Sequence, residues 1–274
     1  MNDFFSFKRF GLLVKKFTKE HLHTYLLLGA SLFGILLVTC GITVLNMLHW
    51  EYQPDAILTI FIGSLMLSIC IFNAAFYGFF QHKAKGIQFL HIPASQAEKL
   101  ALGFLFTQII FLVTFLVLFS VTDNIMCYWY NHFHKFPEHV LPEELPEYVA
   151  HPVNFFSETA KGTIIFSLML AAVSHFGSLC FEKNAFVKTT ICILLIGGAI
   201  FYYNFYSMQA MIPEKNMPGG KFFNQGIRLD AGNDLPGFVS LPSSWYYFMY
   251  WFIPGFAYVS FWMASYYKLK EKQV

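Results

Sequence analysis

Long uninterrupted runs of apolar residues dominate the chain, and short polar segments separate them. Six of these runs contain no Asp, Glu, Lys or Arg, and each approaches or exceeds the roughly 20 residues that a helix needs to cross a bilayer. The runs do not alternate in polarity as the strands of a membrane barrel do. We therefore predict an all-α polytopic membrane protein, with a single membrane domain at residues 1–274 and six transmembrane helices at residues 25–46, 56–80, 100–122, 162–181, 189–209 and 244–267.

The segment before the first run, residues 1–24, has an amphipathic helical pattern instead. Its Phe, Leu and Val residues fall on one broad face, and Lys8, Lys15, Lys16 and Lys19 largely fall on the other. A helix of this kind lies in the membrane interface and is attracted by anionic lipid. We predict an N-terminal interfacial helix at residues 1–24, with a disordered basic tail as the alternative.

The composition supports the membrane assignment and excludes two other classes of protein. Apolar residues make up 56% of the 274 residues, and only 12% are charged, which is roughly half the charged share of average soluble proteins. Such a chain is too apolar for a soluble domain of this length and for an intrinsically disordered protein. The net charge of +2 gives no reason to expect a nucleic-acid partner.

The few charges are distributed unequally between the two sides that six spans create. The side with both termini and the loops at 81–99 and 182–188 carries 13 of the 18 Lys and Arg residues and 5 of the 16 Asp and Glu residues. Cytoplasmic loops are rich in Lys and Arg, so we predict cytoplasmic N- and C-termini in a multi-pass protein of the cell (inner) membrane. Of the longer opposite loops, 123–161 contains several prolines and 210–243 is rich in Gly, Pro and Asn, which predicts irregular turns.

Polar side chains inside the predicted spans are rare, and none of them is formally charged. The candidates are Asn73, Gln108, His175 and Asn204. Such residues either form hydrogen bonds between helices or line a substrate path; His175 is the one of the four that can titrate. The lack of intramembrane charge weighs against a proton-coupled carrier and against an intramembrane enzyme.

The sequence contains no clear pattern of a catalytic or metal-binding site. The phosphate-binding pattern GxxxxGK[ST] does not occur, and the five Cys residues are scattered without CxxC spacing. His132, His134, His139 and His151 could bind zinc, but the prolines around them favour rigid turns. We therefore expect no enzymatic activity, no metal and no cofactor.

The predicted cytoplasmic loop at residues 81–99 has the clearest local pattern. Residues 85–92 form a short amphipathic segment that Pro93 ends, and Ser95 with Glu98 has the capping-box spacing that begins a new helix. Taken by itself, this pattern is also compatible with a simple connecting loop.

The sequence of residues 85–99, KGIQFLHIPASQAEK, resembles the cytoplasmic loop of ABC-2-type transporter permeases, in a divergent, bacteroidete-like branch of that family. The family's loop has a glycine, a short Leu-rich helix, a Pro-x-Ser turn, and a Lys or Glu before the third span. The acidic residue that usually follows the glycine is replaced here by Ile87. The residues that match are Gly86, Leu90, Pro93, Ser95, Glu98 and Lys99.

The resemblance implies a six-span permease subunit of an ABC transporter. A second permease copy or a paralogue would complete the transporter, and the substrate would be a lipid, a drug-like amphiphile or a polymer. The alternatives are a membrane protein with a structural or sensory role and no transport, or, less favoured, an intramembrane enzyme. In the permease, a coupling helix in the loop would contact a separate, soluble ABC ATPase through Lys85, Gly86, Phe89, Leu90, Pro93, Ser95 and Glu98.

Overall fold

Helices account for most of the chain that the structure describes, which confirms the predicted helical class. This computed structural model describes residues 5–48, 52–76, 83–134, 149–181, 184–211, 226–229, 237–240 and 243–272. In chain order the elements are α1 (Phe7–Met47), α2 (Pro54–Phe76), α3 (Lys83–Leu90), α4 (Gln96–Phe104), the π-helical turn η2 (Leu105–Ile110), α5 (Phe111–Phe133), α7 (Glu158–Cys180), α8 (Ala185–Met211), β1 (Gly226–Leu229), β2 (Gly237–Ser240) and α9 (Ser243–Glu271).

Four helices in the described part of the chain are long and apolar enough to cross a membrane. They are α1, α2, the continuous helix Gln96–Phe133, and α7, and a shorter apolar stretch, Val187–Tyr203, lies within α8. The structure thus agrees with a multi-pass membrane protein. The predicted number of six spans is larger than this number of four. In the described residues α8 contains only the shorter apolar stretch, and α9 is helical but is not among the four apolar helices.

Several helix boundaries differ from the predicted spans. The interfacial helix predicted at residues 1–24 and the span predicted at 25–46 are joined in one helix, α1. The span predicted at 100–122 lies within the 38 residues of Gln96–Phe133. This helix is about 57 Å long at 1.5 Å per residue, so it extends beyond a hydrocarbon core about 30 Å thick. Residues 77–80 of the predicted second span lie outside the described residues. The last three predicted spans coincide with α7, α8 and α9 to within about one helical turn.

A short β-hairpin lies in the segment that was expected to form irregular turns. β1 pairs antiparallel with β2, so that Gly226 is opposite Ser240 and Leu229 is opposite Gly237. The composition did not indicate strands here, because four-residue strands are too short to show an alternating pattern. The all-α prediction therefore describes the helices correctly and missed this element.

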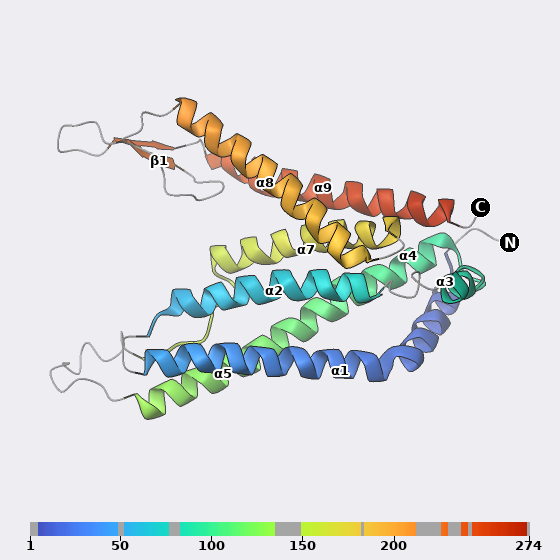
Figure 1. Cartoon of the computed structure of the whole chain (residues 1–274), viewed down its shortest axis with the longest axis horizontal. Coiled ribbons are helices and arrows are strands. Elements are labelled where there is room, and N and C mark those ends of the chain that lie inside the picture. The colour runs from blue at the N-terminus through green and yellow to red at the C-terminus, as the bar shows by residue number, and fades with distance from the viewer. Residues whose placement is uncertain are drawn as a thin grey trace.

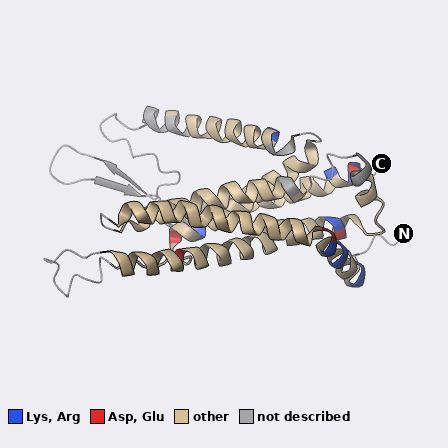
Figure 2. Ribbon diagram, turned by 60° about the horizontal axis from the view of Figure 1, so that its bottom comes forward, with Lys and Arg blue, Asp and Glu red and all other residues tan. Residues whose placement is uncertain are grey.

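The long helices run side by side along the longest axis of the molecule (Figure 1). At one end of this bundle α1 begins, α2 ends, α4 begins and α9 ends, and α3 is seen there end-on; we call this the α3 end. Figure 2 shows that Lys, Arg, Asp and Glu gather toward the ends of the described helices. This arrangement agrees with the predicted placement of both termini and the α3 loop on one side.

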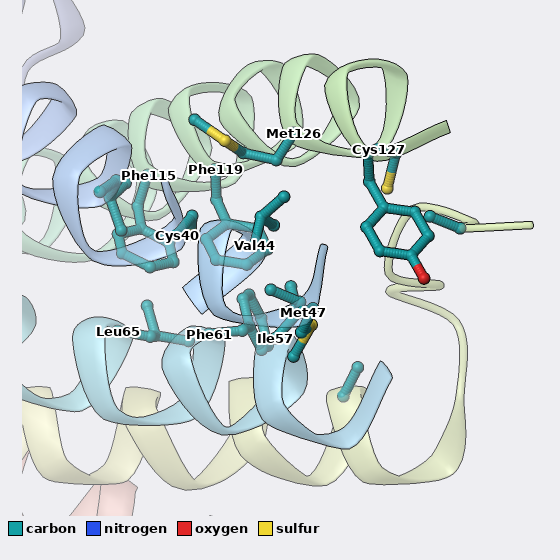
Figure 3. Packing of buried hydrophobic residues seen from close by; sticks show 14 of the residues in the cluster. Cys40, Val44, Met47, Ile57, Phe61, Leu65, Phe115, Phe119, Met126 and Cys127 are labelled. Carbon is teal, nitrogen blue, oxygen red and sulfur yellow. The ribbon is translucent and has the colours of Figure 1, made fainter. Parts of the chain in front are cut away.

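Two clusters of buried apolar side chains hold the helices together. The large core joins α1, α2, α5 and α7, and Figure 3 shows Phe61 and Leu65 of α2 facing Phe115 and Phe119 of α5. The rings of Phe61 and Phe119 have centroids 5.0 Å apart. The small core lies at the α3 end and takes residues from seven helical elements: Leu13, Phe17, Phe76, Phe89, Leu102, Phe106, Leu179 and Leu269.

Candidate functional site

A complete capping box lies at the start of α4, directly after the turn that joins α3 to α4. Ser95 Oγ accepts a hydrogen bond from the backbone N–H of Glu98 at 3.2 Å, and Glu98 Oε2 accepts one from the backbone N–H of Ser95 at 2.9 Å. These bonds satisfy N–H groups that the first turn of a helix leaves without helical partners. The helix start predicted from the Ser95–Glu98 spacing is confirmed.

The other carboxylate oxygen of Glu98 joins this box to the beginning of α1. Glu98 Oε1 accepts hydrogen bonds from the backbone N–H of Ser6 at 2.7 Å, from Arg9 Nη2 at 3.0 Å and from Arg9 Nε at 3.2 Å. The Glu98 side chain is fully buried. Its donors stabilise the charged form of the carboxylate, which also lies at the positive end of the α1 dipole. Glu98 therefore fixes the start of α1, 92 positions away, against α4.

Lys99 holds the end of α3 in a corresponding way. Its side chain is 1% exposed, and Nζ donates a hydrogen bond to the backbone carbonyl of Leu90 at 2.7 Å. Leu90 is the last residue of α3, and the carbonyl groups at a helix C-terminus lack helical partners and carry partial negative charge. The ammonium also lies 5.9 Å from the ring centroid of Phe89, within the range of a cation–π contact. Two adjacent residues of α4 thus hold two different helices.

Most of the predicted ATPase-contact residues turn out to be internal. Pro93 is exposed, and the side chain of Lys85 lies outside the described residues. Five of the seven predicted residues are buried or half-buried, namely Gly86, Phe89, Leu90, Ser95 and Glu98. Residues buried in this way position the loop and offer little surface to a partner.

The exposed side of α3 consists of residues for which the family resemblance gave no role. Ile87 is 55% exposed, and Gln88 and His91 are exposed as well. We call these three residues the outer face of α3, although His91 directly follows the last residue of the helix. The backbone N–H of His91 still donates to the carbonyl of Ile87 at 2.9 Å, so the three share one side of the helix. Phe89, on the other side, is 7% exposed. The amphipathic pattern of the segment contained this signal, since it separates the residues that can face water from those that pack inward.

The predicted intramembrane polar residues are buried inside the bundle. Asn73, Gln108 and His175 each have 0–1% of their surface exposed, and the side chain of Asn204 lies outside the described residues. Asn73 and Gln108 lie at the same depth, because ring contacts between α2 and the helix Gln96–Phe133 bracket both. These contacts join Phe72 to Phe111 at 5.0 Å and Phe76 to Phe106 at 6.1 Å.

The hydrogen bonds of these residues differ from the predicted bonds between helices. Asn73 Nδ2 donates to the carbonyl of Ile69 at 2.8 Å, within its own helix. Neither amide atom of Gln108 has a hydrogen-bond partner in the described structure, and Gln108 lies in the π-helical turn η2. Turns of this type are frequent at functional sites. The free-energy cost of burying the Gln108 amide is therefore not offset by a hydrogen bond within the described residues.

Other contacts at this depth do join helices, and sequence reasoning missed them. Ser174 Oγ donates to Cys70 Sγ at 3.4 Å, which links α7 to α2. The ring of His175 packs on that of Trp262 in α9, with centroids 4.3 Å apart. No sequence signal singled out Ser174 or Trp262, because the pairing depends on which helices become neighbours.

The end of the bundle opposite α3 is also held by a buried carboxylate. Asp123, 2% exposed, accepts a hydrogen bond from the backbone N–H of Val153 at 2.6 Å. Asn131 exchanges two hydrogen bonds with the backbone of Ala150, at 2.8 and 3.1 Å. Because α5 continues to Phe133, Asp123 and Asn131 belong to a helix and fasten the following segment to it, whereas the sequence placed both in a loop.

The histidines near this end are used for packing. His134 Nδ1 donates to the carbonyl of Leu48 at 3.1 Å, and its ring stacks on Tyr130 with centroids 4.6 Å apart. His132 stacks on Tyr128, and His139 lies outside the described residues. No group of three or more His, Cys, Asp or Glu side chains suited to a metal ion occurs among the residues that the structure describes.

Comparisons with models of protein families, with curated proteins and with solved structures give no match to this chain. Its function has to be inferred from its residues and their arrangement.

Proposed function

We propose that the chain is the membrane-embedded permease subunit of an ABC-type transporter in the cell (inner) membrane. It moves a lipid, a drug-like amphiphile or a polymer, with ATP hydrolysed by a separate, soluble ATPase subunit and with a second permease copy or paralogue. Six helices cross the membrane, with α8 and α9 as the fifth and sixth. The amphipathic start of α1 lies in the interface, and both termini and α3 are cytoplasmic.

The observation that carries this proposal is the way in which α3 is attached to the bundle. Lys99 binds its last carbonyl group, and Phe89 packs into the small core. Burying a charge is costly unless it is paired and hydrogen-bonded, and a simple connecting loop needs no such attachment. A force on α3 is passed directly to α4, and from there through Glu98 to α1. This is the mechanical connection that a coupling helix requires.

The outer face of α3 is the surface that an ATPase subunit would bind. Ile87 contributes an apolar side chain, while Gln88 and His91 contribute hydrogen-bonding groups, and all three are exposed. Recognition of a helix in a groove uses this combination of apolar anchor and polar neighbours. Pro93 continues the exposed surface beyond the helix.

The surfaces of α8 and α9 support an amphiphilic substrate. An amphiphile or a lipid can move along the apolar stretches of these helices, because charged residues such as Lys188 and Lys268 lie only near their ends. A second permease can pack against the same stretches. Both helices expose large apolar and aromatic side chains, among them Leu194, Leu195, Tyr202, Tyr203, Trp251 and Phe256.

The test is co-purification of the full chain, expressed in its native host, with a soluble ABC ATPase. The double variant Ile87→Asp/His91→Glu changes the outer face of α3 without touching the small core, and it is expected to lose the ATPase. Phe156→Asp is the matched control, since Phe156 is 80% exposed. It lies two residues before α7, which begins at the end of the bundle opposite α3 (Figure 1). Retention of the ATPase by the double variant would contradict the assignment of the outer face of α3 as the ATPase-binding surface. A chain that never captures an ATPase would favour a structural or sensory role.

A further inference from the structure

A cavity of about 240 Å³ lies at the α3 end, between residues 13–21 of α1 and residues 88–92 in and after α3. Its apolar wall is made by Leu13 and Phe17 of α1 and by Phe89 and Ile92 on the side of α3. Pockets for drug-sized ligands are usually about 300–1,000 Å³. This cavity is therefore too small for a whole amphiphile but suits one polar group with a short apolar extension.

The polar wall of the cavity contains one cation and one anion on successive turns of α1. Lys16 Nζ and Glu20 Oε1 are 3.9 Å apart, with side chains 48% and 53% exposed. Ion pairs of such length and exposure contribute little, so each group can turn to a ligand at small cost. Gln88 adds a neutral amide from α3.

His21 adds a ring nitrogen whose role follows from its hydrogen bond. His21 Nδ1 lies 3.1 Å from the carbonyl oxygen of Phe17, and because a carbonyl only accepts, Nδ1 carries the donated proton. Nε2 is then the ring nitrogen left to meet a ligand. The ring is also held by stacking on Phe17, with centroids 4.3 Å apart.

The surroundings of the cavity are those of a membrane interface. The same part of α1 exposes Phe7 at 84%, Leu12 at 61% and Leu22 at 51%, close to Lys15 and Lys19. A helix with exposed apolar and basic side chains side by side is stable where hydrocarbon meets water. The cavity therefore opens at the depth where lipid headgroups lie.

We propose that this cavity binds the zwitterionic headgroup of an aminophospholipid. The phosphodiester lies at Lys16, the ammonium group lies at Glu20, and the glycerol end leaves along the apolar wall toward the exposed side chains of α1. The charge pattern decides the class of lipid, because a purely anionic headgroup would meet the Glu20 carboxylate beside its phosphate. This site needs no ATPase and is independent of the proposed transport function.

The test measures lipid binding to the full chain in detergent by native mass spectrometry. The chain is titrated with an ethanolamine phospholipid and, separately, with a phosphoglycerol phospholipid of the same acyl chains. Lys16→Gln and Glu20→Gln are each expected to weaken binding of the ethanolamine lipid by about two- to fivefold, the range of one partly exposed ion pair. Phosphoethanolamine without acyl chains is expected to compete more strongly than inorganic phosphate.

The matched controls are Lys268→Gln and Glu271→Gln. These residues form a Lys–Glu pair at 2.6 Å near the end of α9, at the α3 end but outside the cavity, and their variants should bind as the unaltered chain does. The sign of the Glu20→Gln effect is decisive. Tighter binding of the phosphoglycerol lipid by Glu20→Gln is expected, because the carboxylate no longer lies beside its phosphate. Tighter binding of the ethanolamine lipid by Glu20→Gln, or equal competition by inorganic phosphate, would overturn the zwitterionic assignment. Unchanged binding of the ethanolamine lipid in both cavity variants would show that the lipid does not bind in this cavity. No ATPase is present, so these outcomes leave the docking proposal to its own test.

Discussion

The large core and the α3 end hold their helices together by different means. In the large core, rings such as Phe61, Phe115 and Phe119 pack against aliphatic side chains. At the α3 end, the buried carboxylate of Glu98 and the buried ammonium of Lys99 each bind named backbone groups. Apolar packing has no strong direction, whereas hydrogen bonds to charged groups are short and directional. The large core therefore supplies cohesion, and the charged junction determines where α1 and α3 lie.

Glu98→Ala, which removes the acceptor at the charged junction, is expected to cause the largest loss of stability. The substitution leaves Arg9, whose side chain is 35% exposed, and the backbone N–H groups of Ser6 and Ser95 without their acceptor. A hydrogen bond to a charged group contributes about 1.5–3 kcal/mol, and several such bonds are lost together. We expect a lower Tm in detergent and faster hydrogen exchange at the start of α1. Glu98→Gln, which keeps the shape and one acceptor oxygen, should lose less. Equal Tm for Glu98→Gln and the unaltered chain would show that the negative charge is not needed.

The corresponding change in the large core is Phe61→Ala. Phe61 is fully buried, and truncating a buried Phe usually costs about 3–5 kcal/mol. We expect the lower end of that range, since part of the cost in water comes from a transfer term that is weaker when the surroundings are lipid. Tm should fall, while hydrogen exchange in α3 stays unchanged. Accelerated exchange in α3 would mean that the two regions are not separate. Phe156→Ala, at an exposed position, is the control.

The features that the sequence could predict are those that depend on local pattern. The apolar runs identify the helices, and the spacing of Ser95 and Glu98 identifies the start of α4, because a capping box needs only residues three apart. The short helix before Pro93 follows from its amphipathic period. Each of these predictions uses neighbours along the chain, and each is present in the structure.

The features that could not be predicted depend on distant partners. Nothing within the loop indicates that Glu98 binds Ser6, 92 positions away, or that Asp123 binds Val153, 30 positions away. The family resemblance grouped Phe89 and Glu98 with surface contacts, whereas tertiary packing buries both. The π-helical turn at Gln108 has no known sequence signature in these residues, since a one-residue change in helical register depends on the packing around it.

A smaller effect that sharpens the comparison is expected from Lys99→Met. Methionine fills a similar volume but cannot donate to the carbonyl of Leu90, and a hydrogen bond to a charged group contributes about 1.5–3 kcal/mol. The loss should be confined to α3, because Glu98 continues to hold α1. Hydrogen exchange measured by mass spectrometry is expected to rise in residues 83–90 and to stay constant at the start of α1. A rise in both segments would show that the two attachments act as one unit. Lys161→Met, at an exposed residue of α7, is the control.

The smallest expected effect, with the opposite sign, comes from Gln108→Leu. Leucine has a volume close to that of glutamine and removes two buried amide atoms that lack partners in the described structure, so about 1 kcal/mol of stability should be gained. Tm in detergent is expected to rise slightly. Asn73→Leu is the contrasting variant, because it also removes a bond to Ile69 and should gain less. A lower Tm for Gln108→Leu would mean that its amide has a partner, such as a water molecule held in the bundle. A higher Tm together with lost transport would place Gln108 on the substrate path, because buried polar groups that reduce stability persist where they serve function.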